Sequence, residues 1–411
     1  MEDIVTIRRP IFIAKVKPFI DKPIVKVFTG IRRCGKSVMM HLVQSELKDN
    51  GIDESRILSL NFESRNDKRT ANQQSVCDVV AETAKRFSGQ KIYLFFDEVQ
   101  ELIGWEKIIN SFLVDYDCDI YITGSNAHLL SGELATYLGG RYVSINIYPF
   151  SFQELVSLQM AQGKTVDKKA LFREYLTYGG FPFLYNYNFS DSEKNQYLSD
   201  VFDSIIIKDI AQRNAVRDVA LFKQVVTFIM SNVGNTFSAK SIVNYLKSIN
   251  RTISTETLYN YIDYAKNAFL LMMIQRQDLV GKVVLSSQEK IYLTDHGMRQ
   301  ALYGFNTRDI GQILENIVCL ELRRRGYDVT VGKNVENEVD FCCANGNDIS
   351  YYQVAYLLAS PETTEREFGA FRRIKDNYPR YVLSLDEFDF SQNGIIHKNI
   401  IDWLLEYSPE G

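Results

Sequence analysis

The sequence predicts an α/β fold that opens with a parallel five-stranded sheet and continues into helical and mixed regions. Three observations support this. Over the first 150 residues, five apolar runs rich in Ile, Val, Phe and Tyr alternate with amphipathic stretches long enough for crossover helices. The first run leads into a glycine-containing loop, and the third ends in two adjacent acids. The predicted strands are residues 24–28, 57–62, 92–96, 120–123 and 142–147.

Length and composition restrict the class of protein. A chain of 411 residues is too long for one compact core, so several domains are expected. Its 45% hydrophobic and 24% charged residues are ordinary for a globular protein, and the net charge of -4 argues against a strongly basic nucleic-acid binder. The six cysteines form no Cys-x-x-Cys pair, and no signal peptide or membrane-length apolar run is evident. We therefore expect a cytoplasmic protein with reduced thiols and no membrane partner.

The loop after the first predicted strand contains the residues that a phosphate-binding loop requires. Gly30 and Gly35 allow backbone amides to converge on phosphate oxygens, and a helix beginning near Ser37 directs its unpaired amides at the same anion. Lys36 can neutralise charge on the β- and γ-phosphates, and the Ser37 hydroxyl can bind Mg²⁺. The sequence therefore predicts ATP and Mg²⁺ as ligands. The predicted nucleotide-binding residues are Gly30, Arg33, Cys34, Gly35, Lys36, Ser37 and Val38.

The third predicted strand completes the site with two acids. An apolar strand that ends abruptly in carboxylates is costly unless they face a cation or water. Asp97 is placed to hold Mg²⁺ together with Ser37, and Glu98 is placed to orient and deprotonate the attacking water. The adjacent glutamate favours hydrolysis of ATP over phosphoryl transfer to another substrate.

Other polar residues near the strand ends are candidates for contact with the γ-phosphate. After the fourth strand, Ser125 is the first choice and Asn126 the second, with ordinary turn chemistry as the alternative. Arg141 precedes the fifth strand and could act as an arginine finger across a subunit boundary, or could be a surface residue. The side chains of Arg32 and Arg33 are expected to contact protein neighbours rather than the nucleotide.

Several short motifs together resemble the AAA-type ATPases of bacteria and archaea, and more narrowly a group with a C-terminal domain of unknown function. The motifs are TGIRRCGKS at 29–37, DEVQ at 97–100, TGS at 123–125, GR at 140–141 and PFSFQEL at 149–155. The resemblance implies an AAA+ core over residues 1–155, a helical lid over 156–235, a winged helix-turn-helix over 236–305 and a nuclease-like domain over 306–411. It also implies ring or dimer assembly, and in such proteins an Asp-Glu pair and a pre-strand arginine perform the roles given above.

Residues 238–248 and 254–266 fit a helix-turn-helix, with Ser238 and Ser254 as N-caps and a following hairpin as the wing. The second helix carries Glu256 and has no Lys or Arg before Lys266, whereas a helix for the DNA major groove normally offers cations. DNA and a protein therefore both remain candidate partners. Flanking cations that could contact DNA are Lys247, Arg251, Arg276 and Lys282.

The last hundred residues resemble the PD-(D/E)XK nuclease core through Glu315, residues 338–340 and residues 352–355. In that pattern Asp340 would hold a metal, but Gln353 replaces an acid and Ala355 stands where a catalytic lysine is expected. A degenerate domain is therefore favoured over an active nuclease, and Lys375 is the lysine that could substitute. Three functions stay open: an ATPase that drives conformational change, a nucleotide-gated switch with little turnover, and an ATP-gated metal-dependent nuclease.

Overall fold

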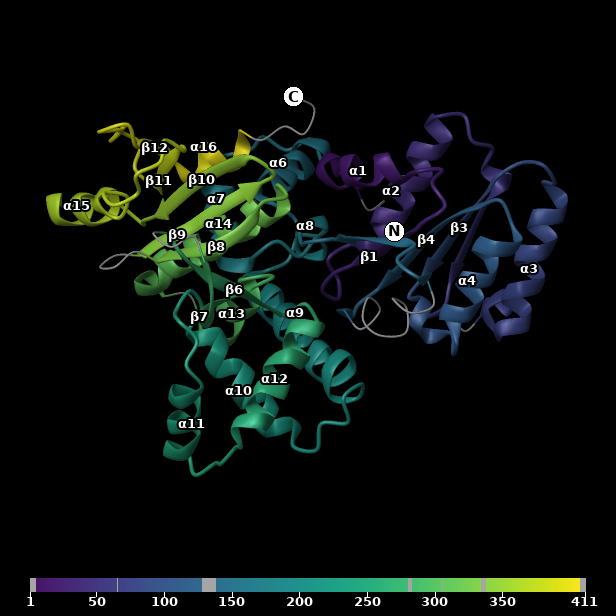
Figure 1. Ribbon diagram of the computed structural model, residues 1–411, viewed down its shortest axis with the longest axis horizontal. Helices are drawn as coiled ribbons and strands as arrows, with labels where there is room; N and C mark the ends of the chain where they lie inside the picture. The colour runs from purple at the N-terminus through teal and green to yellow at the C-terminus, as the bar shows by residue number, and fades with distance from the viewer. Residues whose placement is uncertain are drawn as a thin grey trace.

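The computed structural model describes residues 5–64, 66–127, 138–279, 283–304, 306–333 and 338–406. Two sheets lie at opposite ends of the longest axis, and helices α10–α12 form a third lobe below the second sheet in this view (Figure 1). Within the described residues, no helix combines the length and the apolar character that a membrane span requires.

The first sheet confirms the predicted five parallel strands. Their order across the sheet is β2-β3-β4-β1-β5, and every neighbouring pair is parallel. The strands are β1 (Val25–Thr29), β2 (Ile57–Asn61), β3 (Ile92–Asp97), β4 (Cys118–Gly124) and β5 (Tyr142–Asn146). Helices α1 (Pro10–Val16), α2 (Lys36–Asp49), α3 (Gln73–Arg86) and α4 (Trp105–Asp115) cover it.

Alternation along β1, an interior strand, divides its side chains between two cores. Val25 and Val27 pack into an apolar cluster with α3 and α4, whereas Phe28 packs on the other side with α1, α2 and the helical region that follows. Lys26, which shares the side of Phe28, is fully buried and forms an ion pair with Asp119 of β4. The strand thus has no solvent-facing side, as expected for an interior parallel strand, and its one charged residue is paired.

A helical region follows the first sheet. It comprises α6 (Phe152–Ala161), α7 (Lys168–Tyr178), α8 (Phe183–Asn186), α9 (Asp191–Ser204), a π-helical segment (Ile205–Ala211) and α10 (Val219–Ser231). Capping boxes start two of these helices, with Ser151 and Glu154 at α6 and Ser190 and Glu193 at α9. Short 3₁₀ turns occur at Lys17–Phe19, Glu54–Arg56, Lys68–Thr70, Val99–Glu101 and Thr307–Asp309.

Two helices with the predicted N-caps come next. The Ser238 side chain accepts a hydrogen bond from the Ser241 amide at α11 (Ala239–Ser248), and Ser254 accepts one from the Thr257 amide at α12 (Thr255–Asn267). A long hairpin of β6 (Leu271–Asp278) and β7 (Val283–Leu293) follows, and α13 (Gly297–Tyr303) succeeds it.

The hairpin is part of a larger sheet rather than an isolated wing. The second sheet has seven strands in the order β12-β11-β10-β9-β8-β6-β7, and β6 pairs in parallel with β8 at Arg276–Asp278. The predicted boundary at residue 305 therefore does not separate two sheets. The other strands are β8 (Asp328–Lys333), β9 (Glu338–Asn345), β10 (Asp348–Val354), β11 (Arg380–Ser384) and β12 (Ile396–Asn399).

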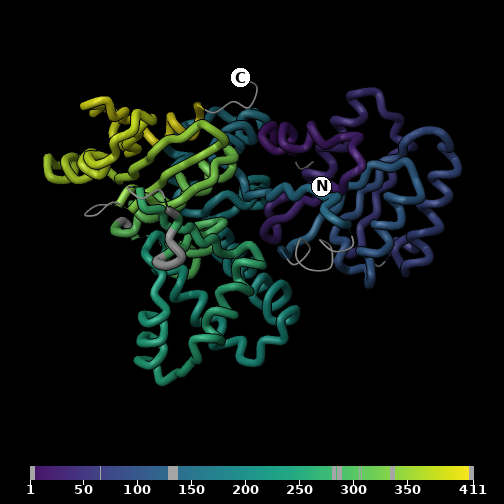
Figure 2. The backbone as a smooth tube through the Cα atoms, in the orientation of Figure 1, coloured from purple at the N-terminus to yellow at the C-terminus, as the bar shows by residue number. Residues whose placement is uncertain are grey.

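Helices α14 (Ile310–Arg324), α15 (Pro361–Gly369) and α16 (Ile400–Leu405) pack around this second sheet. The chain path brings α16, near the C-terminal end, back against α6, which directly follows the first sheet (Figure 2). The two ends of the chain are therefore tied together through the helical region.

Candidate functional site

The loop between β1 and α2 has the geometry that its glycines predict. Gly30 and Gly35 have φ angles of +143° and +99°, and a Cβ on Gly30 would lie 2.2 Å from the carbonyl oxygen of Ile147. Helix α2 begins at Lys36 with no side-chain cap, so the amides of its first turn have no partner from a capping side chain. Ser37 and Val38 in this turn are exposed. The loop and helix start therefore form a concave set of backbone donors suited to an anion.

Lys36 lies inside this loop and is held mainly by backbone oxygens. Its Nζ donates to the carbonyl oxygens of Gly30 at 3.1 Å and Ile31 at 3.3 Å. The Glu98 carboxylate lies further away, with its Oε1 3.9 Å from the same Nζ. The ammonium is thus buried, oriented by the loop and close to an acid without a short ion pair.

The predicted acids lie at the carboxyl end of β3, among polar groups from the strands on either side. Asp97 Oδ1 accepts from the Thr123 hydroxyl at 2.5 Å, and Asp97 Oδ2 accepts from the Asn61 amide at 3.3 Å. The Glu98 backbone amide donates to the same Thr123 hydroxyl at 2.8 Å. Glu98 has a φ of +52°, and its Oε2 accepts from Gln100 Nε2 at 2.5 Å. Three strand ends thus orient the two acids that the sequence selected.

Sequence reasoning overlooked Thr123 and Asn61. Thr123 ends the same β4 run that suggested Ser125, but it is the hydroxyl of Thr123 that contacts Asp97 and Glu98. Asn61 ends β2, opposite Asp97 in the parallel register. The position of Thr123 and Asn61 at strand ends could have identified them, because polar residues that end neighbouring parallel strands meet at one edge of the sheet.

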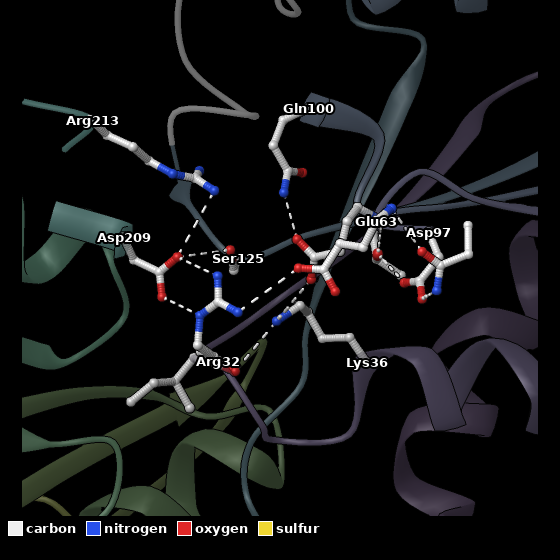
Figure 3. A network of polar contacts seen from close by, with 12 residues as sticks. Arg32, Lys36, Glu63, Asp97, Gln100, Ser125, Asp209 and Arg213 are labelled. Carbon is white, nitrogen blue, oxygen red and sulfur yellow. Dashed lines mark hydrogen bonds and ion pairs between the residues drawn. The ribbon is translucent and has the colours of Figure 1, made fainter. Parts of the chain in front are cut away.

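Ser125 and Arg32 instead meet a carboxylate from the helical region. Arg32 donates to Asp209 through Nε at 2.8 Å and through Nη2 at 3.0 Å, and the Ser125 hydroxyl lies 3.4 Å from Asp209 Oδ1. Figure 3 shows Asp209 and Arg213 arriving from the helical region, with Arg32 and Lys36 coming from the loop after β1. The expected protein contact of Arg32 is therefore present.

Arg141 lies at the other end of the first sheet. Its carbonyl oxygen accepts from the amide of Val25, the first residue of β1, whereas the phosphate-type loop follows the last residue, Thr29. The Arg141 guanidinium donates to Asn110 Oδ1 at 2.6 Å. Arg141 therefore takes no part in the site of its own chain, and its predicted contact across a subunit boundary stays a prediction.

Arg9, from the segment before α1, contacts the backbone of the loop between β1 and α2. Its guanidinium is buried, donates to Glu154 Oε1 at 2.7 Å and to the Cys34 carbonyl at 3.3 Å, and lies over the ring of Phe12. Glu154 also closes the capping box with Ser151 at the start of α6. The Arg9–Glu154 ion pair thus connects the N-terminal segment, the loop and the first helix after the sheet.

A second polar cluster lies in the seven-stranded sheet, where the nuclease-like pattern was expected. Lys290 Nζ on β7 lies 2.9 Å from Glu315, 2.6 Å from Glu338 and 3.8 Å from Asp340. Arg276 on β6 donates to the other oxygen of Glu338 at 2.5 Å. The hairpin therefore supplies the cations of this cluster. Lys375, the substitute named from sequence, is exposed.

The pKa values of this cluster follow from burial and mutual charge. Burial, together with the Glu315 carboxylate, raises the pKa of Asp340 well above its usual value. Burial alone would lower the pKa of Lys290, but Glu315, Asp340 and Glu338 outweigh it and the pKa is raised. Gln353 bonds the Asp340 amide and the Glu367 carboxylate. Across the described parts of the chain, no group of three His, Cys, Asp or Glu side chains is arranged to hold a metal ion.

Several cations expected to serve a DNA-binding surface have acidic partners. Arg276 pairs with Glu338 as above, Arg251 lies 3.5 Å from Asp218, and Lys266 lies 3.0 Å from Asp263. Lys247 is exposed. Lys282 lies outside the described residues.

Comparison with known proteins agrees with the first sheet and its loop. The family described as an AAA domain matches residues 22–156, and a domain of unknown function (DUF8612) matches residues 169–309. Together with the parallel sheet and the phosphate-type loop, this defines an AAA-type P-loop ATPase domain.

The whole chain belongs to the family of an uncharacterized protein from Haemophilus influenzae. That protein is 39% identical over 403 residues, which cover 97% of this chain and 99% of the relative. A second member, from Methanocaldococcus jannaschii, is 33% identical over 369 residues, which cover 86% of this chain and 79% of the relative.

Solved structures are more distant. A Walker-type ATPase of Pyrococcus abyssi aligns with a TM-score of 0.49 at 14% identity. The alignment covers 74% of this chain and 97% of the ATPase chain. Cdc6p of Pyrobaculum aerophilum aligns with a TM-score of 0.34 at 12% identity, covering 77% and 97%. These scores are too low to support an inference about activity.

Proposed function

We propose that this protein binds Mg-ATP at the loop between β1 and α2 and hydrolyses it. The observation that carries the proposal is the arrangement around Lys36: uncapped amides at the start of α2, an ammonium held by two carbonyl oxygens, and Glu98 3.9 Å away. A phosphate group is the anion that satisfies both the amides and the ammonium.

The residues at the strand ends fit a magnesium ion. The hydroxyl of Ser37 and the carboxylate of Asp97 are oxygen ligands of the kind Mg²⁺ prefers, and Thr123 and Asn61 fix the Asp97 carboxylate. When bound, the ion would neutralise charge on the phosphate oxygens. The backbone of the loop would hold the phosphates, and Lys36 would balance their charge.

Glu98 is the proposed base for the attacking water. Its backbone amide is fixed by Thr123, and its carboxylate is oriented by Gln100, so that the acid is positioned beside Lys36. A carboxylate in this place can orient a water and accept its proton. Ser125 and Asn126, both buried at the end of β4, remain candidates for contact with the γ-phosphate.

Phosphate release under steady-state conditions tests the proposal. Glu98→Gln should slow hydrolysis by about 100-fold or more because the water loses its base, while Mg-ATP still binds. Glu101→Gln, at an exposed acid three residues further along, is the matched control and should behave like the unmodified protein. Equal phosphate release from Glu98→Gln and wild type would remove Glu98 from this role and would favour a nucleotide-gated switch.

A role of hydrolysis in moving the rest of the molecule is part of the same proposal. What supports it is the direct contact of the loop with the helical region through Arg32 and Asp209. The acidic partners of Arg251, Arg276 and Lys266 favour a protein partner over DNA for α11 and α12. An ATPase assay with added double-stranded DNA tests this choice, because stimulation would reverse it.

A further inference from the structure

Asp209 is a buried carboxylate that reaches the nucleotide loop from outside the first sheet. Its side chain is 1% exposed and forms a bidentate ion pair with Arg32, through Nε at 2.8 Å and Nη2 at 3.0 Å. Paired N–H···O bonds of this kind are among the stronger and more specific contacts that an arginine makes. The Arg32 side chain is therefore held in one orientation by an acid of the helical region.

A second cation and a hydroxyl share the same carboxylate. Arg213 Nη2 lies 3.8 Å from Asp209 Oδ1, and the Ser125 hydroxyl lies 3.4 Å from the same oxygen. Figure 3 shows these groups converging on Asp209, with Arg32 between Asp209 and Lys36. One buried acid thus connects the phosphate-type loop, the end of β4 and the helical region.

Arg32 belongs to the proposed phosphate loop and lies close to other charged groups of the site. It is the second residue after Gly30, whose carbonyl binds the Lys36 ammonium, and its Nη1 is 3.9 Å from Glu63 Oε1. The Glu98 carboxylate is near enough to contribute to the raised pKa of Arg32, after the hydrogen bond to Asp209 as the main cause. Asp209 occupies the edge of the guanidinium formed by Nε and Nη2, so phosphate oxygens can take that edge only if Asp209 releases it.

We propose that Asp209 competes with the phosphates of Mg-ATP for Arg32 and so couples nucleotide binding to the position of the helical region. The inference rests on the proposed nucleotide site and assigns Asp209 as a positioning residue that acts through Arg32. Phosphate oxygens are bidentate acceptors like a carboxylate, so they satisfy the same two guanidinium donors. Binding of the triphosphate then breaks the contact that ties the loop to Asp209.

The location of Asp209 determines what this release would move. Asp209 lies in the π-helical segment Ile205–Ala211, between α9 and α10, and π-helical turns occur frequently at functional sites. Helix α10 packs against both α11 and α12. Freeing the segment from the loop therefore changes the support of α11 and α12, which form the lobe below the second sheet in Figure 1.

Opposite effects of two substitutions test the proposal by calorimetric titration with Mg-ATP. Asp209→Asn removes the competitor, so Mg-ATP should bind about fivefold or more tightly, whereas Arg32→Ala removes a phosphate contact and should weaken binding by a similar factor. A merely structural ion pair would give losses of affinity for both. Asp203→Asn on α9, which removes a part-exposed pair with Lys223, is the matched control and should leave affinity unchanged.

Hydrogen exchange on the unmodified chain provides a readout that does not depend on either variant folding. Saturating Mg-ATP should raise amide exchange in residues 205–213 at least severalfold if the Asp209 contact is released. Unchanged exchange in a protein that binds Mg-ATP, or weaker binding by Asp209→Asn, would overturn the role of Asp209 alone. Absence of any Mg-ATP binding by the wild type would overturn the proposed function itself, and this inference with it.

Discussion

Two buried lysines, one associated with each sheet, differ in what surrounds them. Lys36 of the first sheet bonds two carbonyl oxygens at 3.1 and 3.3 Å and lies 3.9 Å from Glu98. Lys290 of the second sheet has Glu338 at 2.6 Å and Glu315 at 2.9 Å. The carbonyls around Lys36 orient its charge without neutralising it, so it suits an anionic ligand. The carboxylates around Lys290 neutralise its charge, so it holds strands and helix together.

The largest expected effect is a loss of stability when Lys290, whose charge is neutralised by carboxylates, is replaced. Lys290→Met removes the buried cation that Glu315, Glu338 and Asp340 share, and Arg276 remains only at Glu338, so the free energy of unfolding should fall by about 3–5 kcal/mol. Denaturant titration measures the loss. Lys398→Met, which breaks a part-exposed pair with Glu406, is the control and should change stability by about 0.5 kcal/mol or less. Equal effects of the two substitutions would contradict the comparison.

Removing the other lysine should affect ligand binding rather than folding. Lys36→Met should weaken Mg-ATP binding by about 10- to 100-fold, because a charge-assisted contact with phosphate is lost. Stability should change little, since no short ion pair is broken. Lys48→Met, at the far end of the same helix, serves as the control in the same calorimetric titration. Unchanged Mg-ATP affinity in Lys36→Met would remove the anion-binding role that the comparison assigns.

A smaller effect, on how stability depends on pH, should come from two buried residues between the helical region and the second sheet. Asp295, which follows β7, accepts from the amides of Gly180 and Gly297, and burial raises its pKa to about 7. The neighbouring His296 is also buried, and burial lowers its pKa to about 4. The neutral form of each side chain is therefore the one that folding favours.

These two pKa values predict opposite slopes of stability against pH. Between about pH 4 and 7 the folded chain keeps a proton on Asp295 that the unfolded chain loses. The stabilising contribution of Asp295 to the free energy of unfolding is therefore lost as pH rises from about 4 to 7. For His296 the contribution is lost as pH falls from about 6.5 towards 4. Relative to wild type, Asp295→Asn should therefore gain stability with rising pH, by at most about 1.4 kcal/mol per pH unit.

The corresponding His296→Gln variant should gain relative stability as pH falls over the same range. Unfolding free energies of the two variants and the wild type at pH 4.5, 5.5 and 6.5 check both slopes. Parallel curves for all three proteins would show that neither group titrates differently in the folded and unfolded states.

The sequence predicted the parts of the first site that are encoded locally. Gly30, Lys36 and Ser37 lie within eight consecutive residues, and Asp97 and Glu98 are adjacent, so their spacing along the chain already defines their chemistry. The five parallel strands were also predictable, because apolar runs and crossover helices alternate regularly. The strand ends differ from the prediction by at most about two residues.

The features missed from the sequence depend on packing between distant segments. Asp209 meets Arg32 from 177 positions away, and Lys290 reaches Glu338 only because β6 pairs with β8. Nothing local marks either residue, since an acid in a helix and a lysine in a hairpin are usually solvated. Assigning the hairpin to a separate wing placed Lys290 outside the cluster, which then seemed to lack its lysine.

The sharing of one sheet between the hairpin and the C-terminal strands also sets an order of events during synthesis. The hairpin ends at Leu293, whereas β8, its neighbour in the sheet, is complete only at Lys333. At roughly 5–20 residues per second, the ribosome adds the intervening segment over several seconds. During that delay β6 presents a bare edge to other nascent chains. We therefore expect this edge to be open to non-native strand pairing until translation reaches β8.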